Sequence, residues 1–134
     1  MRKALISVTC LALVLCIAIP ATAFGATSTK SAGSGGHYLR TTITYTPNWT
    51  GATVSTVASS ATTTSSIGKT KKIWLTIKCG LLTYNCVSTG TTFTGAGASP
   101  TWYPNHKMGR PNKLQVSLTG TGLTSLYNTW SNLY

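Results

Sequence analysis

Apolar and polar side chains alternate with a period of two along much of the chain, which predicts β-strands. In residues 71–79, isoleucine and leucine alternate with lysine, tryptophan and threonine. Because successive side chains of a strand point to opposite faces, this pattern gives one apolar and one polar face. The same alternation starts again at Leu39, Val87 and Leu114, so we expect at least four strands.

Two segments have a less regular pattern. Residues 52–66 consist of Ala, Thr, Ser and Val. Val54 and Val57 would lie on opposite faces of a regular strand, so we expect one or two strands there with a bulge. The apolar residues of 123–134 have helical spacing, but the Thr, Asn and Ser between them are weak helix formers. A closing strand is therefore favoured over a short helix.

Turn-forming segments separate the expected strands, and helical segments do not alternate with them. Pro47–Gly51 and Gly95–Pro100 are the clearest turns. This organisation predicts an all-β fold, a small antiparallel sandwich or barrel with one short-range disulfide, in a single β-rich domain over residues 37–134. Residues 26–36 are small and polar and end in a glycine-rich stretch, so we expect a flexible leader there.

The first 25 residues have the features of a signal peptide. Arg2 and Lys3 are followed by an uncharged run that ends at Pro20. This run is shorter than the roughly 20 residues that span a bilayer, which favours export over an uncleaved anchor. Small residues near Ala23 and Gly25 suit cleavage at either position. The sequence therefore predicts a protein secreted to the cell exterior.

The charge of the chain is entirely positive. There are 11 lysine and arginine residues and no Asp or Glu, which gives a formal net charge of +11. Two of the cations lie in the signal segment, which leaves 11 − 2 = 9. Without carboxylates, two-carboxylate glycosidases, Ser-His-Asp triads and carboxylate-held metal sites are excluded. We therefore expect a protein that is not an enzyme and has no cofactor, with His37 and His106 as surface loop residues.

Two cysteines follow the signal segment, Cys79 and Cys86. An even pair in an exported chain predicts a disulfide between them. The alternative is a zinc ion held by these cysteines with His37 and His106. Six residues separate the cysteines, which is wider than the usual two to four or so of zinc sites, so the disulfide is favoured and no metal site is expected.

Two places combine positive charge with aromatic surface. The first is the polar face of strand 71–79 with the residues just before it, and the second is the proline-containing loop 102–111. Each place also has a purely structural interpretation. In the first, the indole packs under a neighbouring loop and the lysines are only solvated; in the second, the loop buries its own aromatic side chains. The candidate binding residues are Lys69, Lys71, Lys72, Trp74 and Lys78 in the first place and Trp102, Tyr103, His106, Lys107 and Arg110 in the second.

The uncompensated charge favours a secreted, cationic, non-enzymatic protein that binds anionic cell-envelope material, either lipid or wall polymer. Antimicrobial or toxin-like action is one form this would take. Export makes nucleic acid the least favoured polyanion. A carbohydrate-binding β-module, in which Trp and Tyr rings stack on sugars, is the second class. A structural or surface-coat protein is the third, because Thr-rich strands are able to pair edge to edge.

Overall fold

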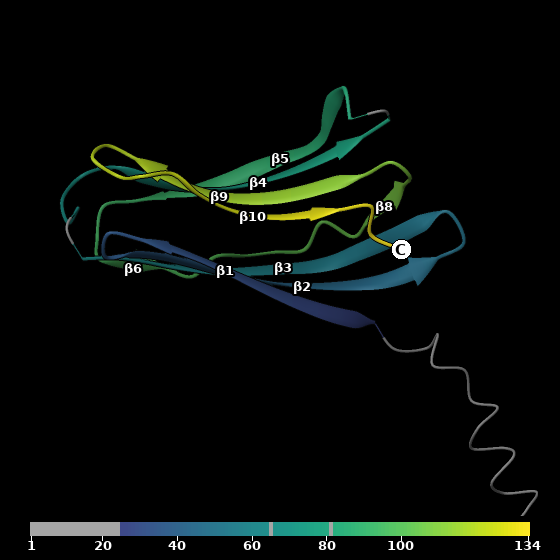
Figure 1. The fold of residues 1–134 in the computed structure, drawn as a ribbon, viewed down its shortest axis with the longest axis horizontal. Helices are drawn as coiled ribbons and strands as arrows, with labels where there is room; N and C mark the ends of the chain where they lie inside the picture. The colour runs from purple at the N-terminus through teal and green to yellow at the C-terminus, as the bar shows by residue number, and fades with distance from the viewer. Residues whose placement is uncertain (1–24, 65, 81) are drawn as a thin grey trace, which may run out of the picture.

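The computed structural model describes residues 25–64, 66–80 and 82–134, and it confirms the all-β prediction. Two antiparallel sheets pack face to face as a sandwich (Figure 1). The described residues contain no helix long and apolar enough to cross a membrane. The predicted signal segment, apart from Gly25, lies outside the described residues.

One sheet, called sheet A, is built on three long strands in the order β1-β2-β3, and three short strands continue it by pairing with β3 in turn. Its strands are β1 (Ala26–Ser34), β2 (His37–Asn48), β3 (Gly51–Thr63), β6 (Gly97–Ala98), β7 (Thr101–Trp102) and β8 (His106–Gly109).

The second sheet, called sheet B, has the order β10-β9-β4-β5. Its strands are β4 (Lys71–Cys79), β5 (Tyr84–Phe93), β9 (Lys113–Gly120) and β10 (Leu126–Ser131). The C-terminal segment is thus a closing strand, as its composition indicated. Because β4 lies between β9 and β5, its polar face is at the centre of the sheet surface.

The core lies between the sheets and is made by the alternating apolar residues of both. Ile73, Leu75 and Ile77 of β4 are fully buried, as the period of two predicted. Burying one such side chain contributes about 1.5–3 kcal/mol, which makes these faces the main source of stability. The facing side chains of sheet A include Leu39, Ile43, Val54, Val57 and Met108.

A bulge in β3 explains the irregular pattern of segment 52–66. Thr44 of β2 is opposite Thr56, but the next residue, Tyr45, is opposite Val54. Ser55 is therefore the extra residue of the bulge, which resets the alternation. As a result Val54 and Val57 are both fully buried on the same face, and the segment is one strand with a bulge.

The expectation of a flexible leader over residues 26–36 is wrong. Residues 26–34 form β1, which pairs along its whole length with β2. Gly35 and Gly36 both have positive φ, 53° and 82°, which suits the tight two-residue turn of a hairpin. Small side chains are no obstacle at the edge of a sheet. Sheet B secures the strand, since Trp130 Nε1 donates to Ser28 Oγ over 2.9 Å.

Candidate functional site

The outer face of sheet B carries the first predicted patch. Since Ile73, Leu75 and Ile77 face the core, the alternate residues of β4 point outward, and Lys72 and Trp74 are exposed. The neighbouring strands continue this face with hydroxyl and amide side chains. They are Ser88 on β5, Gln115, Ser117 and Thr119 on β9, and Thr129 on β10.

Trp74 lies flat across the neighbouring strand. It is opposite Gly90 of β5, and a side chain at Gly90 would collide with carbons of the indole ring. The ring nitrogen donates a hydrogen bond to Ser88 Oγ over 2.9 Å. The side chain remains 37% exposed, so the ring covers the glycine on one side and presents surface to solvent. Because Gly90 has no side chain, the indole lies directly against β5 and forms a flat surface on the sheet.

A second ring extends this row across the sheet. Trp74 is opposite Ser117 of β9, which in turn is opposite Tyr127 of β10. Tyr127 is 52% exposed. Two strand spacings separate their backbones, which places the two Cα atoms about 10 Å apart. Sequence reasoning missed Tyr127, although its alternation with buried Leu126 and Asn128 points it outward.

Two lysines face each other at the end of the sheet that holds the disulfide. Lys78 of β4 is directly opposite Lys113 of β9, and both are half-buried on the outer face. Like charges directly opposite on neighbouring strands repel. No carboxylate side chain exists anywhere in the chain to relieve them. Sequence reasoning did not select Lys113 as a binding residue, because the pairing register is not visible in one strand.

Lys71 is not part of this face, which corrects its selection as a binding residue. It is 0% exposed, because it has the same parity as Ile73 and points inward. Its Nζ donates to the carbonyl oxygens of Ser66, Thr94 and Gly95 over 2.6, 3.2 and 2.6 Å. It also lies 5.0 Å from the centroid of the Phe93 ring. Lys71 therefore joins two loops inside the protein, whereas Lys69 is exposed in the turn before β4.

The second predicted patch is not a single loop. β7 and β8 pair with β3, so the expected loop 102–111 is largely the edge of sheet A. Trp102 packs against the core, while Tyr103 is 70% exposed. Lys107 lies on the outer face of sheet A, because its neighbour Met108 is buried. The Arg110 guanidinium carbon lies 3.4 Å from the centroid of the Tyr134 ring. These candidates are thus distributed over several surfaces.

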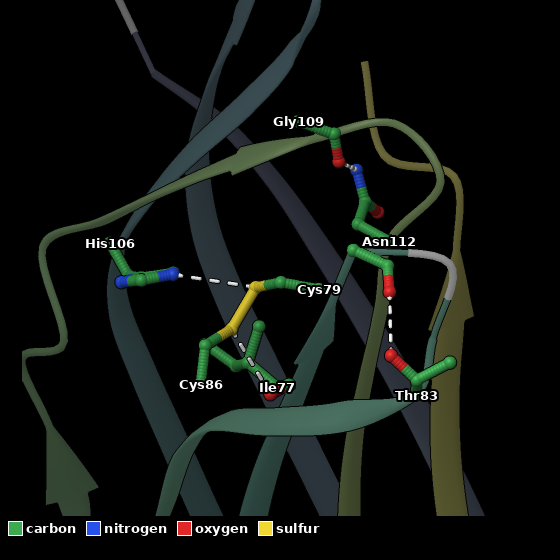
Figure 2. The surroundings of a disulfide bond; sticks show 8 residues. Ile77, Cys79, Thr83, Cys86, His106, Gly109 and Asn112 are labelled. Carbon is green, nitrogen blue, oxygen red and sulfur yellow. Dashed lines mark hydrogen bonds between the residues drawn. A yellow bond between two sulfur atoms is a disulfide. The ribbon is translucent and has the colours of Figure 1, made fainter.

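The predicted disulfide between Cys79 and Cys86 is confirmed, and it joins β4 to β5. The two Cα atoms are 6.0 Å apart. Ile77 is opposite Val87, but Lys78 is opposite Asn85, so Cys86 is the extra residue of a bulge. Figure 2 shows the two sulfurs bonded to each other, with His106 beside Cys79. The disulfide is compatible with an extracellular protein.

The histidines are not surface loop residues, which corrects that expectation. His37 is only 7% exposed and lies on β2, opposite Thr63. His106 is half-buried on β8, opposite Val54. These two register positions are nine positions apart on β3, a distance of about 30 Å along the strand. The four-residue zinc site of two cysteines and both histidines is therefore not assembled.

The outer face of sheet A differs from that of sheet B. It is rich in threonine and serine, and a shallow depression of about 270 Å³ lies beside the exposed guanidinium of Arg40. Ser60 and Ser99 form a hydroxyl pair at 3.3 Å in its wall. The lining residues are Arg40, Thr42, Ala58, Ser59, Ser60, Ser99 and Thr101.

The described surface thus contains one face that combines aromatic platforms with closely spaced cations, the outer face of sheet B. Such a face offers electrostatic attraction to anions and flat apolar contact to rings or methylene groups. Comparison with protein-family models, with curated proteins and with solved structures finds no match to this chain.

Proposed function

We propose that the protein is exported and binds anionic cell-envelope material, membrane or wall polymer, through the outer face of sheet B. The observation that carries this proposal is the cross-strand pair Lys78 and Lys113 in a chain without any carboxylate side chain. A phosphate or carboxylate group between the two ammonium groups would turn a repulsive arrangement into an attractive one. Trp74 and Tyr127 then contact the apolar parts of the ligand.

The arrangement suits an extended polyanion. The lysine pair lies near one end of β4, and Lys72 lies near the other end on the same face, six residues away. This is a span of about 20 Å along the strand. A polymer with repeated negative groups would reach both positions, whereas a single small anion would occupy only one. The aromatic row lies between them, where sugar or polyol segments would pack.

The predicted signal peptide and the disulfide support export, because both are typical of extracellular proteins. The absence of acidic side chains supports binding rather than catalysis, since it removes the common carboxylate general acids and bases. Antimicrobial or toxin-like action would follow from binding if the ligand is essential for envelope integrity. Killing of cells would then decrease together with binding in every variant.

A pair of matched double variants tests the proposed face. K78Q/K113Q removes two charges from the outer face of sheet B, and R40Q/K107Q removes the same charge from sheet A. We expect K78Q/K113Q to lose at least tenfold in affinity for phosphate-containing wall fragments or anionic vesicles, with a smaller effect of R40Q/K107Q. For a phosphodiester polymer, the slope of log Kd against the logarithm of the salt concentration should decrease by about one for each contact removed.

Equal losses in the two double variants would mean that only net charge matters, and this would overturn the assignment to sheet B. Binding by wild-type protein that does not change with salt would overturn the proposal as a whole, because exposed charges are screened within about 10 Å at 0.1 M salt. Circular dichroism of each variant verifies that the sandwich is intact.

The row of Trp74 and Tyr127 favours a second candidate, a neutral carbohydrate-binding module. Exposed aromatic residues two strands apart on one face of a sheet would stack on sugars of one oligosaccharide. In that case W74A/Y127A should abolish binding to neutral polysaccharide, and K78Q/K113Q should leave it unchanged. The reverse pattern supports the anionic ligand.

A further inference from the structure

The surroundings of the disulfide contain a third potential metal ligand. His106 Nε2 lies 3.5 Å from Cys79 Sγ, as the dashed line in Figure 2 shows. The ligand atoms of Cys79, Cys86 and His106 all lie within 4.8 Å of one another. The three residues come from β4, β5 and β8, and therefore from both sheets.

These distances are close to those of a metal site. Zn–S bonds of about 2.3 Å and Zn–N bonds of about 2.0 Å place tetrahedral ligands roughly 3.5 Å apart. The distance between His106 and Cys79 already has this value. The two sulfurs are the exception, because the covalent bond holds them together. Opening that bond is therefore the change that a metal site requires.

Backbone pairing holds Cys79, His106 and the two chain neighbours of Cys86 in place independently of the disulfide. β4 pairs with β5 over the length of both strands, from Lys71 opposite Phe93 to Cys79 opposite Tyr84. β8 is fixed by four register positions on β3, of which His106 opposite Val54 is one. All three ligand side chains are half-buried, so an ion would be partly shielded yet able to enter.

We propose that Cys79, Cys86 and His106 form a metal site that the disulfide keeps closed, and that one Zn²⁺ binds when a dithiol reductant opens it. One thiolate of the reductant attacks a sulfur of the disulfide and forms a mixed disulfide. Its second thiol then displaces the protein sulfur, so the reductant leaves as a cyclic disulfide and two electrons pass to the cysteines. Zinc binding releases the two thiol protons to solvent, and neutral His106 supplies the nitrogen.

Three protein ligands leave the fourth position of a tetrahedral ion for water. The ion would join the ends of β4, β5 and β8 under reducing conditions, whereas the disulfide joins only β4 and β5 under oxidising conditions. This differs from the zinc alternative of the sequence, because His37 lies about 30 Å away along β3 and takes no part.

Cobalt is the probe, because Co²⁺ bound to thiolates absorbs visible and near-ultraviolet light and is displaced by Zn²⁺. Protein reduced with a dithiol, freed of reductant and kept anaerobic, should bind one Co²⁺ per chain with a tetrahedral spectrum. The oxidised protein should give no such spectrum. H106A should bind Co²⁺ at least about tenfold more weakly with a shifted spectrum, while H37N should match the wild type.

A reduced wild-type protein that binds no Co²⁺ would overturn the site. So would H106A with the affinity and spectrum of the wild type, since the cysteines alone would then hold the ion. Should reduction unfold the chain, Zn²⁺ must restore the β-sheet circular dichroism of the reduced protein, and failure to restore it would also refute the proposal.

Discussion

Replacing Lys113 with glutamine should stabilise the protein while weakening the proposed binding of anionic envelope material. Lys113 is opposite Lys78 on the outer face of sheet B, and both side chains are half-buried. Two unit charges about 6 Å apart repel by about 0.7 kcal/mol at the dielectric constant of water and by about 1.4 kcal/mol at half that value. Cross-strand pairs contribute about 0.2–1 kcal/mol in general. We therefore expect K113Q to raise the free energy of unfolding by about 0.5–1 kcal/mol.

Urea unfolding at low and high salt measures this gain. In low salt the midpoint of K113Q should rise above that of the wild type with an unchanged m-value. In 1 M salt the difference should vanish, because the screening length falls to about 3 Å. K107Q removes an exposed charge from sheet A and is the matched control, with a smaller expected change.

A destabilised K113Q, or a gain that does not change with salt, would refute the reasoning from repulsion. Stabilisation with undiminished binding to anionic wall fragments would separate the lysine pair from the proposed function. The combination of higher stability and weaker binding is the pattern expected of a site that is strained in the absence of its ligand.

Three further changes test the packing around the site. Lys71→Met should destabilise the protein by about 2–4 kcal/mol in urea unfolding, because three carbonyl oxygens lose their donor inside the protein. Unchanged stability would show that water replaces the ammonium group. Gly90→Ala should lower the free energy of unfolding by about 1–3 kcal/mol, since the added methyl group collides with the indole of Trp74 and with the carbonyl oxygen of Ile73; unchanged stability in urea unfolding would contradict this close packing. Cys79→Ser with Cys86→Ser should lower the free energy of unfolding by about 2–3 kcal/mol, the chain-entropy value for a short loop, and an unchanged value would mean that strand pairing alone fixes this end.

The parts of the fold that the sequence predicted are those with regular alternation. The buried residues of β4 follow from the alternation of apolar and polar side chains, and the closing strand β10 follows from the scarcity of helix-forming residues. The leader was misjudged because Thr, Ser and Gly in 26–36 lack an apolar period, yet an edge strand needs only one partner. The Gly35–Gly36 pair was the available signal for the hairpin turn.

The candidate site was only partly predictable, for a related reason. Parity placed Trp74 and Lys78 on the outer face, and the same parity should have placed Lys71 inside. Its lysine side chain suggested exposure, because three converging carbonyl groups from distant loops are not visible in a sequence. Lys113 and Tyr127 became relevant only through the register of β9 against β4 and β10, which a single sequence does not contain.

The enclosed amine of Lys71 makes the protein its own reporter of local opening. Acylating reagents should modify exposed amines such as those of Lys69 and Lys72 quickly, while Lys71 reacts only when the loops that hold Ser66 and Gly95 separate. The ratio of its labelling rate to that of an exposed amine therefore measures the free energy of this opening event. One acylation time course would then report the opening of this end of the sandwich without an added probe residue.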